Sequence, residues 1–232
     1  MPATKAHKSK YNAKHIIYED GDKKTVYSGG SRAWRTNNPG NIKSRGPFPR
    51  RHGAIGSDGV NAIFPDYETG KDAMVANLHR RDYTVLSINN MIATYAPASD
   101  GNNVPAYQRY VHDQTGLDMN RIFGSLDSAE FSSVVDALES YEHSSAGETW
   151  VMKTIQATKS TNDQNFTDFK VDGAWISKSD AMDQVRQDRL DAVISGDHLR
   201  PSPGQPDFES IEEEATDEEE GEDPKHKDPD DR

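Results

Sequence analysis

The spacing of apolar residues predicts two short β-hairpins in the first third of the chain. Apolar and aromatic positions at 15–18 and 25–27 flank an Asp-Gly pair, which favours a tight turn between two strands. A second pair of short strands brackets residues 53–64, with its turn at residues 57–59. Residues 1–14 are polar and basic, and we expect a basic flexible arm there.

The apolar spacing then changes to a helical period and predicts four helices. Their apolar positions are Met74, Val75 and Leu78; Ile88, Met91, Ile92 and Tyr95; Ala106, Tyr107, Tyr110 and Val111; and Phe131, Val134, Val135 and Leu138. Asp66 is placed to cap the first helix, and Pro97 stops the second. Asp127 and Glu130 form a capping-box pattern at the start of the fourth. Two hairpins followed by about four helices predict an α+β domain over residues 15–148.

The remainder of the chain predicts a small appendage and a tail. Residues 169–176 read as a hairpin around an Asp-Gly turn, and an amphipathic helix is expected from Met182 to Ile194. Residues 158–168 are polar and predict a linker. We assign residues 149–200 to this hairpin-helix appendage. Residues 201–232 are rich in Pro and Glu, and we expect a disordered acidic tail.

Charge and composition narrow the classes of partner. Residues 207–232 carry 14 acidic and 3 basic side chains, so they account for 11 of the 12 net negative charges of the chain. The body is therefore close to neutral, which argues against a nucleic-acid partner. The chain has no Cys, which excludes disulfides, a thiol nucleophile and a Cys-ligated metal. No apolar stretch is long enough for a signal peptide or a membrane span.

The sequence RTNNPGNIK, residues 35–43, predicts a rigid loop that carries side-chain amides. Pro39 fixes its own φ, whereas Gly40 and the Asn residues tolerate positive φ. Amides in fixed positions suit a polyhydroxylated or N-acetylated ligand. We therefore take Asn38 and Asn41 as substrate-binding candidates, with Asx-turns as the alternative role for these residues.

Three segments together resemble a known family. RAWRTNNPGNIK, GAIGSDGVNAIFPDYETG and TYAPASDGNNVPAYQRYV are similar, in the same order, to the RNNNPGNIR, GAIGxDGxFAIFPDxxTG and YAPPSENDTxxY motifs of phage virion proteins and of type VI or Rhs-associated peptidoglycan hydrolases. The resemblance covers residues 16–148. A weaker similarity to glucosaminidases of the flagellar and autolysin type points the same way. Both imply a lysozyme-like fold that acts on cell-wall glycan.

Cutting a glycan requires a carboxyl group that can hold a proton near neutral pH. Glu142 fits this role because Phe131, Val135, Leu138 and Glu142 lie on one face of the fourth helix, whose C-terminus disfavours a negative charge. The alternative is an exposed, inert Glu at a frayed helix end. Glu68 is the second catalytic candidate. It lies on the first turn of a helix, where negative charge is stabilised, so it would serve better as a base or nucleophile.

The resemblance adds two substrate-binding candidates. Tyr95 ends a helix just before Ala96-Pro97, where glucosaminidases place a Tyr in the sugar cleft, although a core role is the alternative. The loop SDGNN, residues 99–103, replaces the acidic SEN segment of the family, and Asn103 is our candidate there. The His residues show no metal-ligand spacing, and no nucleotide-binding or cofactor motif is present, so we expect neither a metal nor a cofactor.

The sequence thus predicts a peptidoglycan glycan-strand hydrolase of muramidase, glucosaminidase or lytic transglycosylase type. The alternative is a virion or host-interaction protein that binds cell-wall glycan without cutting it. A third option is a DNA-mimicking or chaperone-binding protein that acts through its tail. Without a signal of its own, the hydrolase would be made in the cytoplasm and carried to the periplasm or wall by virion or secretion-apparatus proteins, and an immunity protein is a further expected partner.

Overall fold

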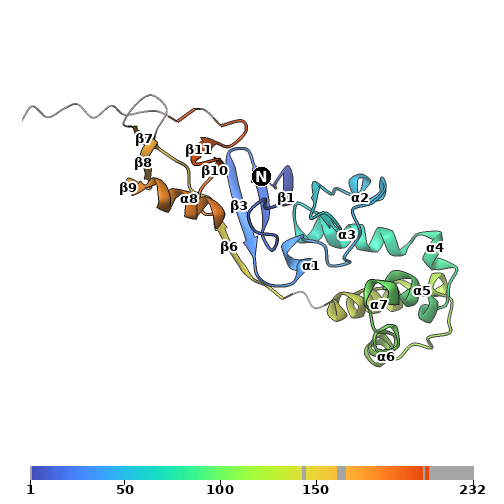
Figure 1. The fold of residues 1–232 in the computed structure, drawn as a ribbon. Coiled ribbons are helices and arrows are strands. Elements are labelled where there is room, and N and C mark those ends of the chain that lie inside the picture. The colour runs from blue at the N-terminus through green and yellow to red at the C-terminus, as the bar shows by residue number, and fades with distance from the viewer. Residues whose placement is uncertain (1, 143–144, 161–165, 206, 209–232) are drawn as a thin grey trace, which may run out of the picture.

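The computed structural model of the protein describes residues 2–142, 145–160, 166–205 and 207–208. The molecule is elongated, with a sheet in the middle, helices at one end and a small mixed unit at the other (Figure 1). The structure confirms a mixed α+β architecture. Within the described residues, no helix has the length and apolar character needed to cross a membrane.

The central sheet has six strands in the order β5-β4-β1-β2-β3-β6. The strands are β1 Lys5–Lys8, β2 Ile16–Asp20, β3 Lys23–Ser28, β4 Gly56–Ser57, β5 Ala62–Ile63 and β6 Glu148–Val151. Both predicted hairpins are confirmed, because β2 pairs with β3 and β4 pairs with β5 in antiparallel register. Ile16, Tyr18 and Ile63 bury one face of the sheet.

The first residues of the chain form a strand where the sequence predicts a flexible arm. β1 pairs antiparallel with β2 and parallel with β4, so it joins the two hairpins into one sheet. Its sequence, KAHK, buries only Ala6. Hydrophobic patterning therefore could not reveal this strand. β6 pairs with β3 and so carries the sheet beyond residue 148, the expected end of the domain.

The helical lobe contains all four predicted helices. The helices of the N-terminal two thirds are α1 Arg32–Arg35, α2 Phe48–Arg51, α3 Tyr67–Leu78, α4 Arg81–Thr84, α5 Ile88–Tyr95, α6 Val104–Thr115 and α7 Ser128–Tyr141, with 3₁₀ turns at Ala98–Asp100 and Phe123–Ser125. Asp66 caps α3, and Asp127 and Glu130 form the expected capping box on α7. The core of the lobe is built from fully buried side chains of α3, α5, α6 and α7, among them Ile92 and Leu138.

The C-terminal unit differs in part from its prediction. It consists of β7 Ala157–Ser160, β8 Phe166–Val171, β9 Ala174–Ser177, α8 Lys178–Arg186, β10 Ala192–Ser195 and β11 His198–Pro201. The β8–β9 hairpin is confirmed, and the ends of the expected linker lie in β7 and β8. The helix expected to reach Ile194 ends at Arg186, and Val193 and Ile194 lie in β10 instead. The acidic tail expected at residues 201–232 begins later than predicted, because Pro201 lies in β11 and Ser202 is buried. Residue 206 and residues 209–232 of this tail lie outside the described residues.

A buried polar network attaches the C-terminal unit to the central sheet. The Asp188 carboxylate accepts a hydrogen bond from Ser9 Oγ at 2.8 Å, and its other oxygen lies 2.8 Å from His15 Nδ1. Lys24 Nζ lies 2.7 Å from an Asp191 oxygen, and the Trp150 indole N–H donates to the Asp188 carbonyl. Buried charges of this kind require partners, so these contacts fix how the unit sits on the sheet.

Trp150→Phe should lower the free energy of unfolding by roughly 1 kcal/mol, because it removes the indole N–H that bonds the Asp188 carbonyl and keeps the aromatic ring. Chemical denaturation measures the change. Trp175→Phe, at an exposed position on β9, is the matched control and should leave stability within about 0.5 kcal/mol of wild type. Equal losses in the two variants would contradict a specific role of the Trp150 bond.

Candidate functional site

The Asn-rich loop after α1 has the unusual backbone that its composition predicts. Asn37 and Asn41 both have positive φ, at 49° and 47°, in the left-handed region that Asn tolerates better than most residues. The loop also packs very closely on the helix α3. A Cβ on Gly70 would lie 1.8 Å from the Asn37 carbonyl oxygen, so only glycine fits there. The loop is therefore held rigidly against the helical lobe.

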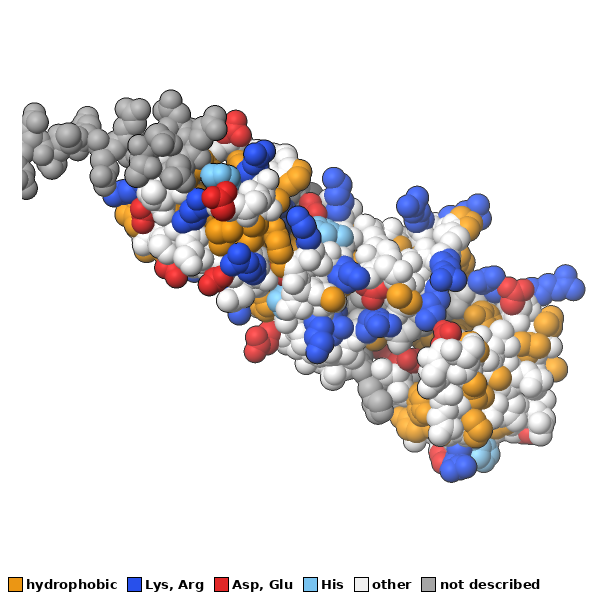
Figure 2. Space-filling view, viewed as in Figure 1, with side chains coloured by type: hydrophobic (Ala, Val, Ile, Leu, Met, Phe, Trp, Pro, Cys, Tyr) orange, Lys and Arg blue, Asp and Glu red, His pale blue; other side chains and the backbone are white. Residues whose placement is uncertain are grey.

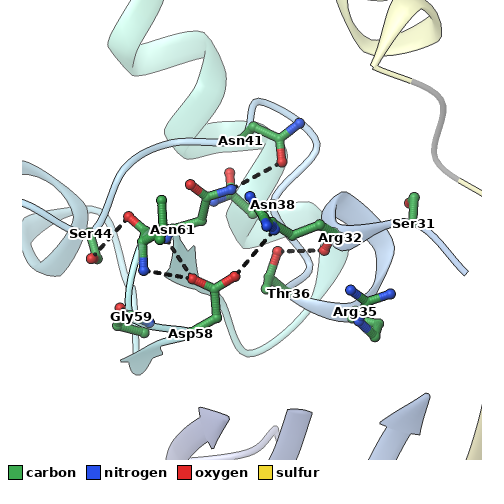
Figure 3. A network of polar contacts seen from close by, with 12 residues as sticks. Ser31, Arg32, Arg35, Thr36, Asn38, Asn41, Ser44, Asp58, Gly59 and Asn61 are labelled. Carbon is green, nitrogen blue, oxygen red and sulfur yellow. Dashed lines mark hydrogen bonds and ion pairs between the residues drawn. The ribbon is translucent and has the colours of Figure 1, made fainter. Parts of the chain in front are cut away.

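Asn38 and Asn41 point to different sides of this loop (Figure 3). Asn38 is fully buried, and its amide donates to the carbonyls of Ile42 and Ala62 and accepts from the Ile42 N–H, all at 2.9–3.0 Å. Asn38 thereby ties the loop to β5. Asn41 is half-buried and faces the end of α7.

Glu142 lies at the C-cap of α7 and meets the loop directly. Its Oε2 accepts a hydrogen bond from Asn41 Nδ2 at 2.7 Å, and its Oε1 lies 3.1 Å from the Tyr107 hydroxyl. Asn41 is itself positioned by Asn61, whose Nδ2 donates to Asn41 Oδ1 at 3.3 Å. Asn61 just before β5, Asn41 in the loop and Tyr107 on α6 thus fix both oxygens of one carboxyl group.

The Tyr107 hydroxyl can form a hydrogen bond with Glu142 whether the Glu142 carboxyl is ionised or protonated. It lies 3.1 Å from the Leu138 carbonyl as well as 3.1 Å from Glu142. When Glu142 is ionised, the Tyr107 proton can be shared with the carboxylate. When Glu142 is protonated, Tyr107 can donate to Leu138 and accept the carboxyl proton. Burial, the neighbouring Tyr95 and Glu142 together raise the pKa of Tyr107 well above its ordinary value, so its hydroxyl stays protonated.

Glu142 opens into a polar cavity of about 250 Å³, which we call the Glu142 cavity. Its other lining residues are Ser31, Arg32, Ala33, Gly40, Asn41, Lys43, Asn61, Tyr95, Ala96, Asp100 and Asn102. Tyr95 donates to the Gly40 carbonyl at 2.8 Å, and burial raises its pKa well above the usual value, with the Glu142 charge adding to the effect. Tyr95 therefore presents a fixed, neutral phenol to the cavity.

Two ion pairs lie at the rim of the Glu142 cavity. Lys43 Nζ lies 3.1 Å from an Asp100 oxygen, and Arg32 Nε lies 3.5 Å from Asp58. The side chains of Arg32 and Lys43 are 54% and 51% exposed, so both cations remain open to solvent. Asp58 also accepts two backbone N–H bonds in the β4–β5 turn, so it stabilises this turn as Asp commonly does.

The structure brings three of the six candidate residues together and leaves three elsewhere. Glu142, Asn41 and Tyr95 line one cavity. Glu68 is exposed on the first turn of α3, Asn38 is buried in the loop, and Asn103 caps α6 through the Ala106 N–H. These three side chains are not among those that line the Glu142 cavity.

Sequence reasoning missed four residues that meet here: Asn61, Asp100, Asn102 and Tyr107. The SDGNN loop did point to this cavity, although the residue chosen from it was one position too far along. Asn61 could have been found from a departure in the sequence, because the motif that this segment resembles carries Phe at this position. Its Oδ1 is buried and has no hydrogen-bond partner among the described residues.

The described part of the chain holds no group of three or more His, Asp or Glu side chains that could bind a metal ion. The side chains at the Glu142 cavity supply two carboxyl groups, from Glu142 and Asp100, together with amides, phenols and two cations. A scan against models of known protein families finds no match to this chain, and a search of curated proteins finds none either.

Proposed function

We propose that the protein cleaves the glycan strand of peptidoglycan, with Glu142 as the general acid. The observation that carries this proposal is the setting of the Glu142 carboxyl, which is fixed by Asn41 and Tyr107 at the wall of a cavity rich in hydrogen-bonding groups. A carboxyl group held in this way can give its proton to a glycosidic oxygen as the bond to the sugar breaks. The polar lining suits the hydroxyl and acetamido groups of a sugar.

The same cavity holds a second carboxylate, Asp100. An inverting or retaining hydrolase uses a second carboxylate to activate water or to attack the sugar, whereas substrate assistance can replace it in other glycosidases. Its carboxylate lies 3.1 Å from the Lys43 ammonium at the rim of the cavity, which fixes its position there. Asp100 is therefore the candidate base or nucleophile of this proposal, in place of the remote Glu68.

Asp100→Asn tests whether the second carboxylate takes part. We expect cleavage of purified sacculi to fall by about 10²-fold or more, because Asn can neither attack the sugar nor accept a proton from water. Asp82→Asn, at an exposed position on α4, is the matched control. Unchanged turnover in Asp100→Asn would leave Glu142 as the single catalytic carboxyl and would favour substrate assistance or a lytic transglycosylase.

Mass spectrometry of sacculi incubated with the protein tests the proposal as a whole. Anhydro-muramic ends identify a lytic transglycosylase, reducing muramic ends a muramidase and reducing glucosamine ends a glucosaminidase. Unchanged sacculi that still sediment with the protein would overturn the hydrolase proposal and support a wall-binding protein. The SDGNN loop favours that alternative, because it replaces the acidic segment of the family motif.

Several further elements of the proposal rest on the resemblance in the sequence. They are a lysozyme-like arrangement of the sheet and helices, delivery by a virion or a secretion apparatus, and an immunity protein as a partner. The first is supported by the contact between the loop after α1 and the end of α7, where Asn41 and Glu142 meet at the polar Glu142 cavity.

A further inference from the structure

A second cavity lies between the central sheet and the C-terminal unit, and we call it the Asp191 cavity. Its volume is about 370 Å³, which lies in the range of small-ligand sites. Strands β1, β2 and β3 supply one wall, and residues between 188 and 203 of the C-terminal unit supply the other. It shares no lining residue with the Glu142 cavity, so a ligand bound here would not occupy the proposed catalytic site.

The buried part of the Asp191 cavity holds two carboxylates, Asp188 and Asp191. Asp188 has a partner for each of its two oxygens. Asp191 uses only Oδ1, which accepts from Lys24 Nζ at 2.7 Å and from the Ser202 hydroxyl. Its Oδ2 is buried and has no hydrogen-bond partner among the described residues. A buried carboxylate oxygen in this state is costly, so the cavity favours a ligand that brings a hydrogen-bond donor.

The charges in this buried part call for a cation as well. Asn12 Oδ1 accepts the Lys14 N–H at 3.0 Å, so Asn12 Nδ2 is the atom that donates to His15 Nε2, also at 3.0 Å. His15 therefore bonds Asp188 through its Nδ1–H as a neutral ring. Two carboxylates then share the single ammonium of Lys24, and one negative charge is left over. A ligand ammonium would balance this charge and donate to the unpartnered oxygen.

The rim of the Asp191 cavity has the opposite charge. Lys5 and Lys10 are exposed lining residues that form no ion pair among the described residues. The one acid at the rim, Glu19, lies 3.3 Å from His7. Figure 2 shows basic side chains around an apolar area where β3 and β10 lie in Figure 1. A carboxylate on the outer end of a ligand would therefore meet two cations.

Apolar side chains complete the walls. Ile17 on β2, Met152 after β6 and Val193 on β10 all line the cavity. The Tyr11 ring lines it too and is held in place, because its hydroxyl accepts the Ile194 N–H at 3.0 Å. These groups suit a short hydrocarbon body between the two charged ends of a ligand.

We infer that the Asp191 cavity binds a small zwitterion of the amino acid class, with its ammonium at Asp191 and its carboxylate toward Lys5 and Lys10. This site is independent of the proposed function. A simple anion would leave the Asp191 oxygen without a donor, and a simple amine would leave the two lysines without a partner. An ammonium also fits better than a metal ion, because the described residues contain no group of three His, Asp or Glu side chains that could hold one.

Calorimetry with the full chain tests the inference, with leucine and the dipeptide Ala-Leu as probes. We expect at least one of them to bind, and to raise the melting temperature because it bridges the sheet and the C-terminal unit. The N-acetylated and the C-terminally amidated forms of the bound probe should each bind at least about tenfold more weakly, since each loses one charged hydrogen bond. No binding of either probe, or equal binding of the N-acetylated form, would overturn the inference.

Variants at both ends of the cavity locate the probe. Asp191→Asn should weaken binding by about tenfold or more, because its NH₂ group replaces an acceptor with a donor. The double variant Lys5→Gln, Lys10→Gln should also weaken binding, and it keeps the test valid if Asp191→Asn fails to fold, because both lysines are exposed. Lys14→Gln is the matched control, since Lys14 is exposed and does not line the cavity. Unchanged affinity in the double variant would overturn the inference.

Asp191 also borders a smaller cavity of about 250 Å³ on the C-terminal unit, whose other charged lining residue is Asp207. Neither Lys5 nor Lys10 lines that cavity. A probe bound there would be weakened by Asp191→Asn and by Asp207→Asn but not by the lysine variants. That pattern would overturn the assignment to the Asp191 cavity, whereas loss of binding in the lysine variants with Asp207→Asn unchanged would support it.

Discussion

Glu142→Gln is expected to reduce cleavage of purified sacculi by about 10²-fold or more while glycan binding is kept. The amide has almost the shape of the carboxyl group but carries no proton that it can give to a leaving oxygen. Its oxygen can still accept the Asn41 N–H, and its NH₂ can donate to the Tyr107 hydroxyl, because Tyr107 can turn its own proton to the Leu138 carbonyl. The site should therefore keep its geometry and lose only the acid.

Two measurements accompany this variant: the release of soluble fragments from sacculi, and sedimentation with sacculi as the measure of binding. Glu68→Gln serves as the comparison, because Glu68 is exposed on α3 and does not line the Glu142 cavity. It should retain wild-type turnover. The opposite result, loss of turnover in Glu68→Gln alone, would reverse the assignment of the acid.

The parts of the fold that the sequence predicted are those with local signals. The capping box at Asp127 and Glu130, the Asp66 cap and the helical spacing of apolar residues each act within one or two turns, and the structure contains all of them. The two hairpins likewise depend on turns of a few residues. Signals of this kind are readable without knowing the rest of the fold.

The parts that could not be predicted depend on pairing between distant segments. β1 is a strand because β2 and β4 lie on both sides of it, and its own sequence buries only Ala6. The expected helix to Ile194 fails for a related reason. Asp188 adopts a positive φ of 54°, while Ser9 and His15, about 175 residues earlier, hold its carboxylate. The Val193-Ile194 pair then extends as β10 against β11.

The candidate site also combines features that local signals predict with contacts that only the fold creates. Helical spacing placed Glu142 on the same face as Leu138, but only the fold brings it to Asn41, which lies 101 residues earlier. Asn38 and Asn41, to which the sequence analysis gives the same role, differ in the structure because of the loop backbone, in which Asn37 and Asn41 have positive φ. Both residues are Asn and both belong to the loop after α1, but Asn38 is buried in the core whereas Asn41 lines the cavity.

This pair of asparagines gives the second large effect, because one substitution at two nearby positions should act on two different properties. Asn38→Ala is expected to lower the free energy of unfolding by roughly 3 kcal/mol, since it leaves the buried Ile42 N–H without an acceptor and removes one donor each from the Ile42 and Ala62 carbonyls. Asn41→Ala should cost about 1 kcal/mol or less, because its side chain is half-buried at the cavity wall.

Turnover should fall more in Asn41→Ala than in Asn38→Ala when both variants are assayed well below their melting temperatures. Asn41→Ala removes the donor that fixes Glu142 Oε2 at 2.7 Å, so turnover of sacculi should fall by about tenfold or more even though the protein remains folded. The folded fraction of Asn38→Ala should keep much of its turnover, because Asn38 contacts neither Glu142 nor the cavity. Thermal unfolding and turnover measured on both variants decide the matter. If Asn41→Ala unfolds as readily as Asn38→Ala, or if its turnover equals that of wild type, then Asn41 only shapes the loop and does not position the acid.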